Sequence, residues 1–283
     1  MSTSAISPQQ VQFFEDNGYV HLSGVIGAEE LESLRAAEDA LTAPAMQSRL
    51  HNADYSYVRD PKTGKMMLSR IDWLHTKGEA FLKLYGHPVL LGIAEAIFGH
   101  DSVAPGGGFS MVVKSPGYGA AVPWHRDPGF CTLRHGINLG VYLDDATPQN
   151  GMLSVVPGSH KIEGIDLQEM IEEHGFDLPG AIPVATRAGD VVVHSENVLH
   201  GSRVVRSQTK RRVIYYGFRT IEEQLSRGLD ADWVRSKARV MQFAIEKRAA
   251  SNADETPFQP NPTAPEYRVE LRPNQYVELR IGE

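Results

Sequence analysis

The chain has 283 residues, of which 41% are hydrophobic and 22% charged, a balance typical of a globular protein with a sizeable core. Its net charge of −7 argues against nucleic acid or an anionic membrane as the main partner, because both are bound by clustered Lys and Arg. No apolar run approaches the roughly 18 to 20 residues of a membrane span. The N-terminus lacks the pattern of a signal peptide, and the lone Cys131 can form no internal disulfide, so we expect a cytoplasmic protein.

The first hundred residues carry helical patterns interrupted by one irregular stretch. Ser7 is a good helix cap, and Gly99 ends a strongly apolar helical segment. Residues 43–78 are polar and lack a clear period, which predicts a long connection of the kind that often forms a lid. The predicted elements are a helix at 8–17, a strand at 19–22, an amphipathic helix at 27–41 and a buried helix at 87–99.

After the glycines at 106–108 the pattern changes to short β-like runs separated by turns rich in Pro, Gly and Asp. The runs FSMVVK, INLGVYLDD, GMLSVVPG, AIPVATRAGDVVVH and RVIYYGF predict a mainly β protein, an antiparallel jelly roll with flanking helices. A short helix is expected at 165–178, a longer one up to 249 and a last strand at 267–281. We expect one domain, 1–283, with a helical and lid part over 7–100, a jelly-roll core over 101–220, and a C-terminal helix and tail over 221–283.

The segment PWHRDPGF places His125 and Asp127 two residues apart. On an antiparallel strand such residues share one face, so an imidazole and a carboxylate would point the same way. Two His and one carboxylate on one side of an ion are the ligand set of non-haem Fe(II) oxygenases. HRD also occurs in protein kinases, but the other kinase motifs are missing. His200, which follows an apolar run, is a candidate for the third ligand.

Several segments, in order along the chain, resemble the phytanoyl-CoA dioxygenase family of Fe(II)- and 2-oxoglutarate-dependent oxygenases. They are FFEDNGYVHLSGVIGAEELESLR, KSPGYGAAVPWHRD, NGMLSVVPGSH, AGDVVVHSENVLHGS and KRRVIYYGF, which cover most of residues 10–220. The resemblance implies a double-stranded β-helix, a cupin-like jelly roll, with His125, Asp127 and His200 as the catalytic metal ligands. It also implies that Arg211, eleven residues beyond the distal His, binds 2-oxoglutarate, and that O2 is the second co-substrate.

An arginine suits the distal carboxylate of 2-oxoglutarate, because a guanidinium makes a two-pronged contact that Lys cannot copy. Alternation along RRVIYYGF sends Arg211 and Arg212 to opposite faces, and we predict that Arg211 faces the site. We expect Arg206, Lys210 and Arg212 on a solvated hairpin. Lys114 either contacts the co-substrate, as in some members of the family, or lies in solvent at the end of its strand.

The substrate is predicted to be a medium-sized, partly hydrophobic small molecule, such as a natural-product intermediate. Gly140 stands where members of the family carry a bulky aromatic residue, which would widen the pocket. The candidate substrate-binding residues are Met111, Phe130, Gly140, Tyr142 and Phe218. We expect a monomer or a homodimer with no nucleic acid or membrane partner.

The resemblance implies that 2-oxoglutarate is decarboxylated while a C–H bond of the substrate is oxidised, most often by hydroxylation and in some enzymes by desaturation or epoxidation. Asp127 fills the position that is open for chloride in related halogenases, so halogenation is disfavoured. Two other interpretations stay open, a jelly-roll isomerase or hydrolase that uses the same ligands with zinc or manganese, and a non-catalytic small-molecule-binding jelly roll. His194, which forms a second His-x-carboxylate pair with Glu196, is not expected to bind metal.

Overall fold

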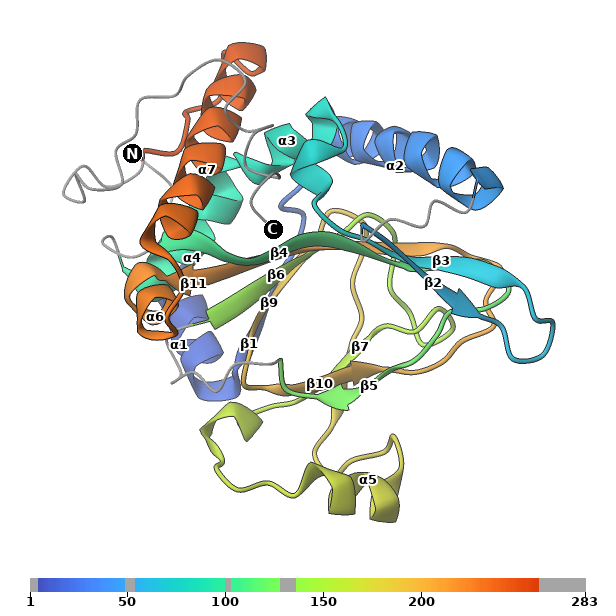
Figure 1. The fold of residues 1–283 in the computed structure, drawn as a ribbon. Coiled ribbons are helices and arrows are strands. Elements are labelled where there is room, and N and C mark those ends of the chain that lie inside the picture. The colour runs from blue at the N-terminus through green and yellow to red at the C-terminus, as the bar shows by residue number, and fades with distance from the viewer. Residues whose placement is uncertain (1–4, 49–53, 100–102, 128–135, 260–283) are drawn as a thin grey trace.

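The computed structural model describes residues 5–48, 54–99, 103–127 and 136–259 of the chain. Two antiparallel sheets face each other, and helices cover the outer face of the larger sheet (Figure 1). This arrangement is a jelly roll, and it confirms the predicted mainly β fold with flanking helices.

The larger sheet runs in the order β1-β9-β6-β11-β4-β3-β2, with each neighbouring pair antiparallel. Among the described strands β11 comes last in the chain, yet it lies at the centre of this sheet between β6 and β4. The strands are β1 (Tyr19–Leu22), β2 (Tyr55–Arg59), β3 (Met66–Ile71), β4 (Val103–Lys114), β6 (Gly136–Tyr142), β9 (Val191–Ser195) and β11 (Arg211–Thr220).

The smaller sheet runs in the order β5-β10-β7-β8 and is also antiparallel. It consists of β5 (Val122–His125), β7 (Leu153–Val156), β8 (Ile182–Val184) and β10 (Leu199–Ser202). Because β10 pairs with β5, two segments that are far apart in the sequence lie side by side.

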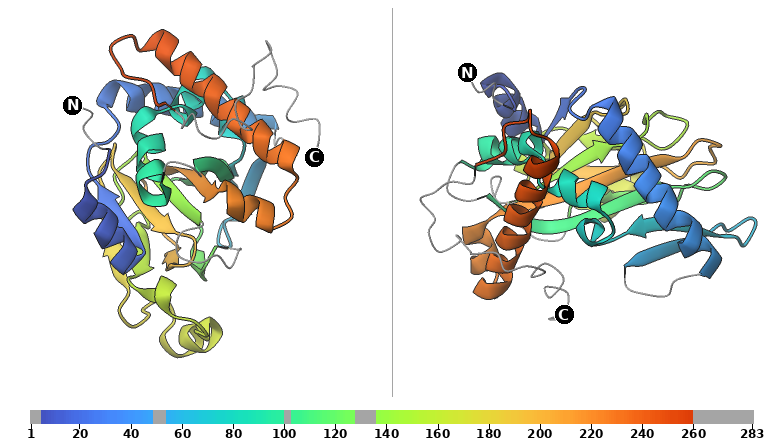
Figure 2. Two further views of the ribbon diagram at one scale, coloured as in Figure 1. Left: turned by 90° about the vertical axis from the view of Figure 1, so that its left-hand side faces the viewer. Right: turned by 90° about the horizontal axis from the view of Figure 1, so that it is seen from above.

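Helices α2, α3 and α7 lie over the outer face of the larger sheet, whereas α5 lies beyond the smaller sheet (Figure 1, Figure 2). The helices are α1 (Pro8–Asn17), α2 (Ala28–Ser48), α3 (Glu79–Tyr85), α4 (Pro88–Phe98), α5 (Leu167–His174), α6 (Ile221–Ser226) and α7 (Ala231–Ser251), with short 3-10 turns at Leu74–Thr76 and Ser159–Lys161. The predicted helices at the N-terminus, at 87–99, at 165–178 and up to 249 are therefore present.

Local signals set the ends of α1. The Ser7 hydroxyl accepts a hydrogen bond from the Gln10 backbone N–H, and the Gln10 side chain accepts one from the Ser7 N–H, so the two residues form a capping box. The helix ends at Gly18, whose φ of 78° lies in the left-handed region that glycine adopts without strain. The turn directs the chain into β1, which pairs with β9 of the larger sheet.

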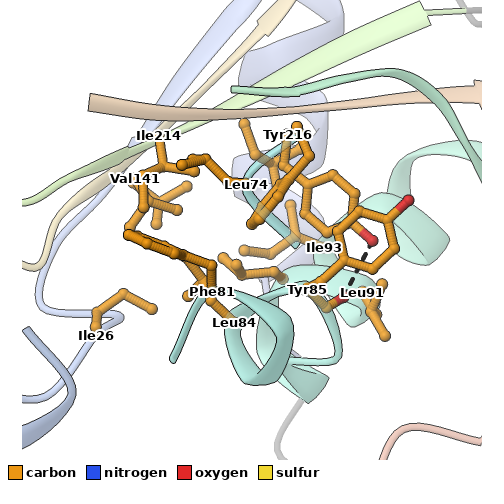
Figure 3. Close-up of a cluster of buried hydrophobic side chains, with 14 of the residues drawn as sticks. Ile26, Leu74, Phe81, Leu84, Tyr85, Leu91, Ile93, Val141, Ile214 and Tyr216 are labelled. Atoms are coloured by element: carbon orange, nitrogen blue, oxygen red, sulfur yellow. Dashed lines mark hydrogen bonds between the residues drawn. The ribbon is translucent and has the colours of Figure 1, made fainter. Parts of the chain in front are cut away.

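The main hydrophobic core lies between the helices and the outer face of the larger sheet (Figure 3). Tyr85 of α3 stacks on Tyr216 of β11 with 4.5 Å between ring centroids, and the Tyr216 hydroxyl donates to the Tyr85 carbonyl at 3.0 Å. Ile214 and Val141 of the sheet are fully buried beside Phe81. Burial of each such side chain contributes roughly 1.5–3 kcal/mol. The helix-facing side of β11 is thus fixed by the core, and its other side faces the space between the two sheets.

The prediction of an irregular lid at 43–78 is wrong for the described part of this stretch. Helix α2 continues to Ser48, and β2 and β3 form a hairpin in which β3 pairs with β4 at the edge of the larger sheet. No residue of β2 is fully buried, so its sequence lacks the apolar alternation that identifies an inner strand.

The segment Glu79–Phe98 is long and apolar enough, by length and composition alone, to cross a membrane, which corrects the expectation that no such run exists. In the structure it forms two helices, α3 and α4, and 56% of this window is buried inside the protein. Its buried side chains belong to the core shown in Figure 3. The expected last strand at 267–281 lies outside the described residues.

Candidate active site

The pairing of β5 with β10 brings two histidines together. His125 lies directly across from His200, and their ring centroids are 4.2 Å apart. Asp127 follows β5, and its backbone N–H donates to the Glu196 carbonyl at 2.8 Å. The Nε2 atoms of His125 and His200 lie 3.5 Å and 3.9 Å from the Asp127 carboxylate oxygens. One ligand atom from each of the three residues lies within 4.8 Å of the others, so they can share one metal ion.

Hydrogen bonds orient each of these side chains. His125 Nδ1 lies 2.8 Å from the Pro123 carbonyl, and His200 Nδ1 lies 2.9 Å from the Val198 carbonyl. Because a carbonyl only accepts, both Nδ1 atoms carry the proton and both Nε2 lone pairs are free to bind a metal. Asn138 Nδ2 donates to Asp127 Oδ2 at 2.7 Å, which fixes the carboxylate. Two imidazoles and one carboxylate on one side of a common point fit Fe(II) with the remaining positions open.

The charge states also suit a metal site. Burial is the main reason that the pKa of His200 falls to about 3, so its imidazole is neutral at ordinary pH. Burial alone would raise the pKa of Asp127, but the hydrogen bond with His125 and the neighbouring imidazoles hold that pKa below its usual range. A neutral imidazole and an ionised carboxylate are the forms that bind a divalent cation.

The three residues open onto a cavity of about 380 Å³ between the two sheets. The cavity wall also contains three arginines, Arg70, Arg211 and Arg219, and the apolar Val112, Val122 and Leu153. Its other polar residues include Ser110, Asn138, His194, Glu196, Ser202 and Tyr215. The wall is therefore more polar than the sequence predicted.

Arg211 has the features of an anion anchor. Its side chain is 2% exposed and lies at the cavity wall, where Nη1 donates to the Gly151 carbonyl and Nε has no hydrogen-bond partner. Within the described part of the chain, no carboxylate lies within 4.0 Å of its guanidinium. A buried guanidinium without a counter-ion is costly, so the site is built for an anion such as the distal carboxylate of 2-oxoglutarate.

Arg212 lies on the opposite face of β11, and the expectation that it lies in solvent is wrong. Its guanidinium pairs with Asp144 at 2.7 Å and with the fully buried Glu38 of α2 at 3.1 Å. Lys210 binds the same Glu38 at 2.5 Å, and Arg206 pairs with Asp60 at 2.8 Å. The basic run is therefore largely neutralised by nearby acids, whereas Arg211 has no acidic partner among the described residues.

Lys114 is buried, which corrects the alternative that places it in solvent. It lies opposite Arg211 in the β4–β11 register, and its ammonium donates to the Ala120 and Arg203 carbonyls at 2.6 Å and 2.7 Å. Burial, together with the nearby Arg211 charge, lowers the pKa of Lys114 to about 7. Lys114 does not line the cavity, so its contact with the co-substrate stays a prediction.

The predicted substrate-binding residues lie mostly elsewhere. Met111 and Phe218 point into the helix-facing core, and Tyr142 packs with Val213 between the sheets, away from the cavity wall. A Cβ at Gly140 would lie 3.3 Å from the Tyr215 ring, so this glycine makes room for Tyr215 and does not widen the cavity. Met111 does not line the cavity; its neighbours Ser110 and Val112 do. Phe130 lies outside the described residues.

His194 lies beside the site without joining the ligand set. Its ring centroid is 4.4 Å from that of His200, and both line the cavity. Glu196 binds Arg219 at 2.7 Å, and this buried pair forms another part of the wall. Sequence reasoning missed Asn138, because Asn138 lies in the larger sheet and Asp127 follows a strand of the smaller sheet, and only the packing of the two sheets brings them together.

A jelly roll with a His-Asp-His metal site beside a buried, unpaired arginine defines a non-haem iron oxygenase that uses 2-oxoglutarate. A family model described as "Phytanoyl-CoA dioxygenase (PhyH)" matches residues 14–213. The chain belongs to this family, and it is a 2-oxoglutarate-dependent non-haem iron dioxygenase that requires Fe(II), 2-oxoglutarate and O2. The zinc or manganese enzyme and the non-catalytic module are therefore set aside.

Several characterised proteins are similar to the chain. A probable alpha-ketoglutarate-dependent hypophosphite dioxygenase of Stutzerimonas stutzeri is 23% identical, over 74% of this chain and 77% of its own length. The ectoine dioxygenase of Halomonas elongata is 25% identical, over 75% of this chain and 69% of its own. The crystal structure of EvdMO1 superposes on this chain with a TM-score of 0.65 and is 33% identical in sequence. The superposition covers 75% of this chain and about half (49%) of EvdMO1.

Proposed function

We propose that the chain oxidises a C–H bond of a medium-sized small molecule, most often by hydroxylation, with desaturation or epoxidation as the alternative outcomes. The observation that carries this proposal is the metal triad at the wall of the cavity that Arg211 also lines. Arg211 holds one end of 2-oxoglutarate while the metal takes the other, which leaves the rest of the cavity for substrate. Asp127 occupies a metal position, which disfavours halogenation.

When bound, Fe(II) and 2-oxoglutarate supply the oxidising chemistry, in which O2 converts the co-substrate to succinate and carbon dioxide. The protein's own residues supply position. His125 and His200 present deprotonated Nε2 atoms, because their Nδ1 protons are held by backbone carbonyls. Asn138 keeps the Asp127 carboxylate turned toward the histidines.

The size of the cavity supports a small-molecule substrate, of which a natural-product intermediate is one example. The names of the two curated relatives refer to hypophosphite and to ectoine, which are also small molecules. We further propose that residues 1–283 act as one oxygenase domain in the cytoplasm, as a monomer or a homodimer, without nucleic acid or membrane partners.

The test is anaerobic addition of Fe(II) and 2-oxoglutarate to the purified protein. We expect a weak visible charge-transfer band from the chelate, and succinate once air is admitted. Asp127→Ala should remove the band, and Arg211→Met should weaken 2-oxoglutarate binding. Arg59→Gln, which removes an exposed arginine that binds the Gly64 carbonyl, should behave like the unaltered protein. The absence of both the band and succinate in the unaltered protein would refute the proposed function.

A further inference from the structure

The charges of the cavity wall leave one arginine without a role. Asp127 belongs to the metal, and Glu196 and Arg219 neutralise each other at 2.7 Å. Arg211 is assigned to the co-substrate. Arg70 of β3 also reaches the cavity wall; its side chain is 46% exposed and pairs through Nε with Asp72, which does not line the cavity.

Arg70 is oriented toward that space. Its Nε donates to Asp72 Oδ1 at 2.8 Å, which fixes one edge of the guanidinium and leaves the Nη groups for another acceptor. A Cβ placed on Gly108 would lie 3.7 Å from Arg70 Nη2 and 3.9 Å from Ser110 Oγ. Because Gly108 has no side chain, the space between these two polar groups stays open.

Ser110 gives a second, independent sign of a ligand. Its side chain is 1% exposed and lines the cavity, yet its hydroxyl has no hydrogen-bond partner among the residues that the structure describes. Buried hydroxyls are paired in the great majority of folded proteins, so an unpaired one at a cavity wall points to a missing partner. A hydroxyl that donates beside a guanidinium is a suitable partner for an oxyanion.

The position of these groups differs from that of the co-substrate anchor. Arg211 lies opposite Lys114 on β4, whereas Ser110 lies four residues earlier on the same strand, about 13 Å along it. Arg70 lies opposite Val112, which stands on β4 midway between Ser110 and Lys114. The wall of one cavity therefore carries Arg211 and the pair Arg70 and Ser110 at different heights along β4.

We infer that Arg70 and Ser110, across the gap left by Gly108, form a subsite that binds an anionic group of the substrate, either a carboxylate or a phosphonate. The inference rests on the proposed function, because it names the class of substrate for that site. Such a contact would hold one end of the substrate and so select which C–H bond approaches the metal. Arg70 would be a specificity residue and would take no part in the oxidation itself.

The experiment uses three probes that share a six-carbon chain: hexanoate, hexylphosphonate and the neutral hexanamide. Binding is measured by calorimetry, both on protein loaded anaerobically with Fe(II) and saturating 2-oxoglutarate and on protein without either. We expect at least one anion to bind ten times more tightly than hexanamide in both forms. The tighter of the two anions identifies the headgroup that the subsite prefers.

Three variants test the residues. Arg70→Gln should abolish the preference for the anion, Ser110→Ala should reduce it about threefold to tenfold, and Gly108→Ala should reduce it by filling the gap. Arg59→Gln on the same hairpin removes the same charge and should leave the preference intact.

Three results would overturn the inference. The unaltered protein could bind neither anion more tightly than hexanamide, or Arg70→Gln could weaken the binding of all three probes equally. The third is competition between the anion and 2-oxoglutarate for binding. Failure of 2-oxoglutarate to bind the unaltered protein would instead refute the proposed function, and the measurement without co-substrate would still test the subsite.

Discussion

Replacing Arg211 with Met should make the protein more stable and less able to bind its co-substrate. The guanidinium is buried beside Lys114, with one backbone partner and no carboxylate among the described residues. Arg211→Met loses one hydrogen bond, worth about 1 kcal/mol, but removes an uncompensated buried charge whose effective cost is several kcal/mol. We expect the ligand-free variant to be about 1–3 kcal/mol more stable. The loss of two charge-assisted hydrogen bonds, about 1.5–3 kcal/mol each, should weaken 2-oxoglutarate binding by roughly 10²- to 10⁴-fold.

The neighbouring Arg212 gives the matched control. Arg212→Met leaves Asp144 without the arginine that binds it through Nε and Nη2, and it removes one of the two cations paired with the fully buried Glu38, whose other partner, Lys210, remains. Breaking a buried pair in this way costs about 3–5 kcal/mol. Two substitutions of the same kind at adjacent positions should therefore change stability in opposite directions.

Urea unfolding of metal-free protein measures the stability of each variant, and anaerobic calorimetry with Fe(II) measures 2-oxoglutarate affinity. Added co-substrate should raise the midpoint of the unaltered, Fe(II)-loaded protein and have little effect on Arg211→Met. A less stable Arg211→Met variant, or one whose 2-oxoglutarate affinity stays within threefold, would contradict the assignment of Arg211 as an anchor kept at the expense of stability.

Three further results are expected. Burial, with the nearby Arg248 charge, lowers the pKa of His87 to about 4. Since the unfolded value is about 6.5, the unfolded chain binds more protons between these values, and His87 alone should lower stability by about 2 kcal/mol from pH 7 to pH 5, in addition to the loss from the buried His200. Gly136→Ala places a Cβ 2.1 Å from Glu196 Oε2 and should cost about 1–3 kcal/mol in urea unfolding. Asn138→Ala removes the hydrogen bond to Asp127 and should weaken Mn(II) binding about 10- to 100-fold by calorimetry.

Each of these predictions has its own control. His87→Asn keeps a helix cap at the start of α4 and should reduce the loss of stability between pH 7 and pH 5 by about 2 kcal/mol, and an unchanged slope would exclude a contribution from His87. Gly140→Ala lies on the same strand as Gly136 but approaches its neighbour only to 3.3 Å, so a cost as large as that of Gly136→Ala would rule out the steric argument. For Asn138→Ala, unaltered Mn(II) affinity in a folded protein would show that the amide does not orient the ligand.

The sequence was informative where function depends on local spacing. The pair His125 and Asp127 lies two residues apart on one segment, and family resemblance added His200 and Arg211, which the structure brings to one cavity. The fold was predictable for a similar reason, because the inner strands are continuous apolar runs between clear turns.

Features that depend on partners distant in the sequence could not be predicted. Alternation correctly sent Arg212 away from Arg211, but nothing local indicated that α2 would cover that face and supply Glu38. The hairpin of β2 and β3 lies at a sheet edge, where half-exposed residues give no clear period, and so Arg70 was not considered. Met111 was misplaced because both faces of its strand are buried, so its hydrophobicity does not show whether it faces the helices or the cavity.

The central place of β11 has a consequence for how the chain is made. During synthesis, β4 emerges from the ribosome 97 residues before β11 begins, counting from Lys114 to Arg211. At a synthesis rate of about 5–20 residues per second, β11 follows β4 after about 5–20 s, and it follows β6 sooner. Until then, β4 and β6 lack the strand that lies between them. Their unpaired edges are then open to wrong partners, and chaperones that shield such edges should raise the yield of folded protein. The strand that carries Arg211, the proposed co-substrate anchor, is thus the one that joins β4 to β6, and a chain interrupted before Arg211 lacks the central strand of the larger sheet.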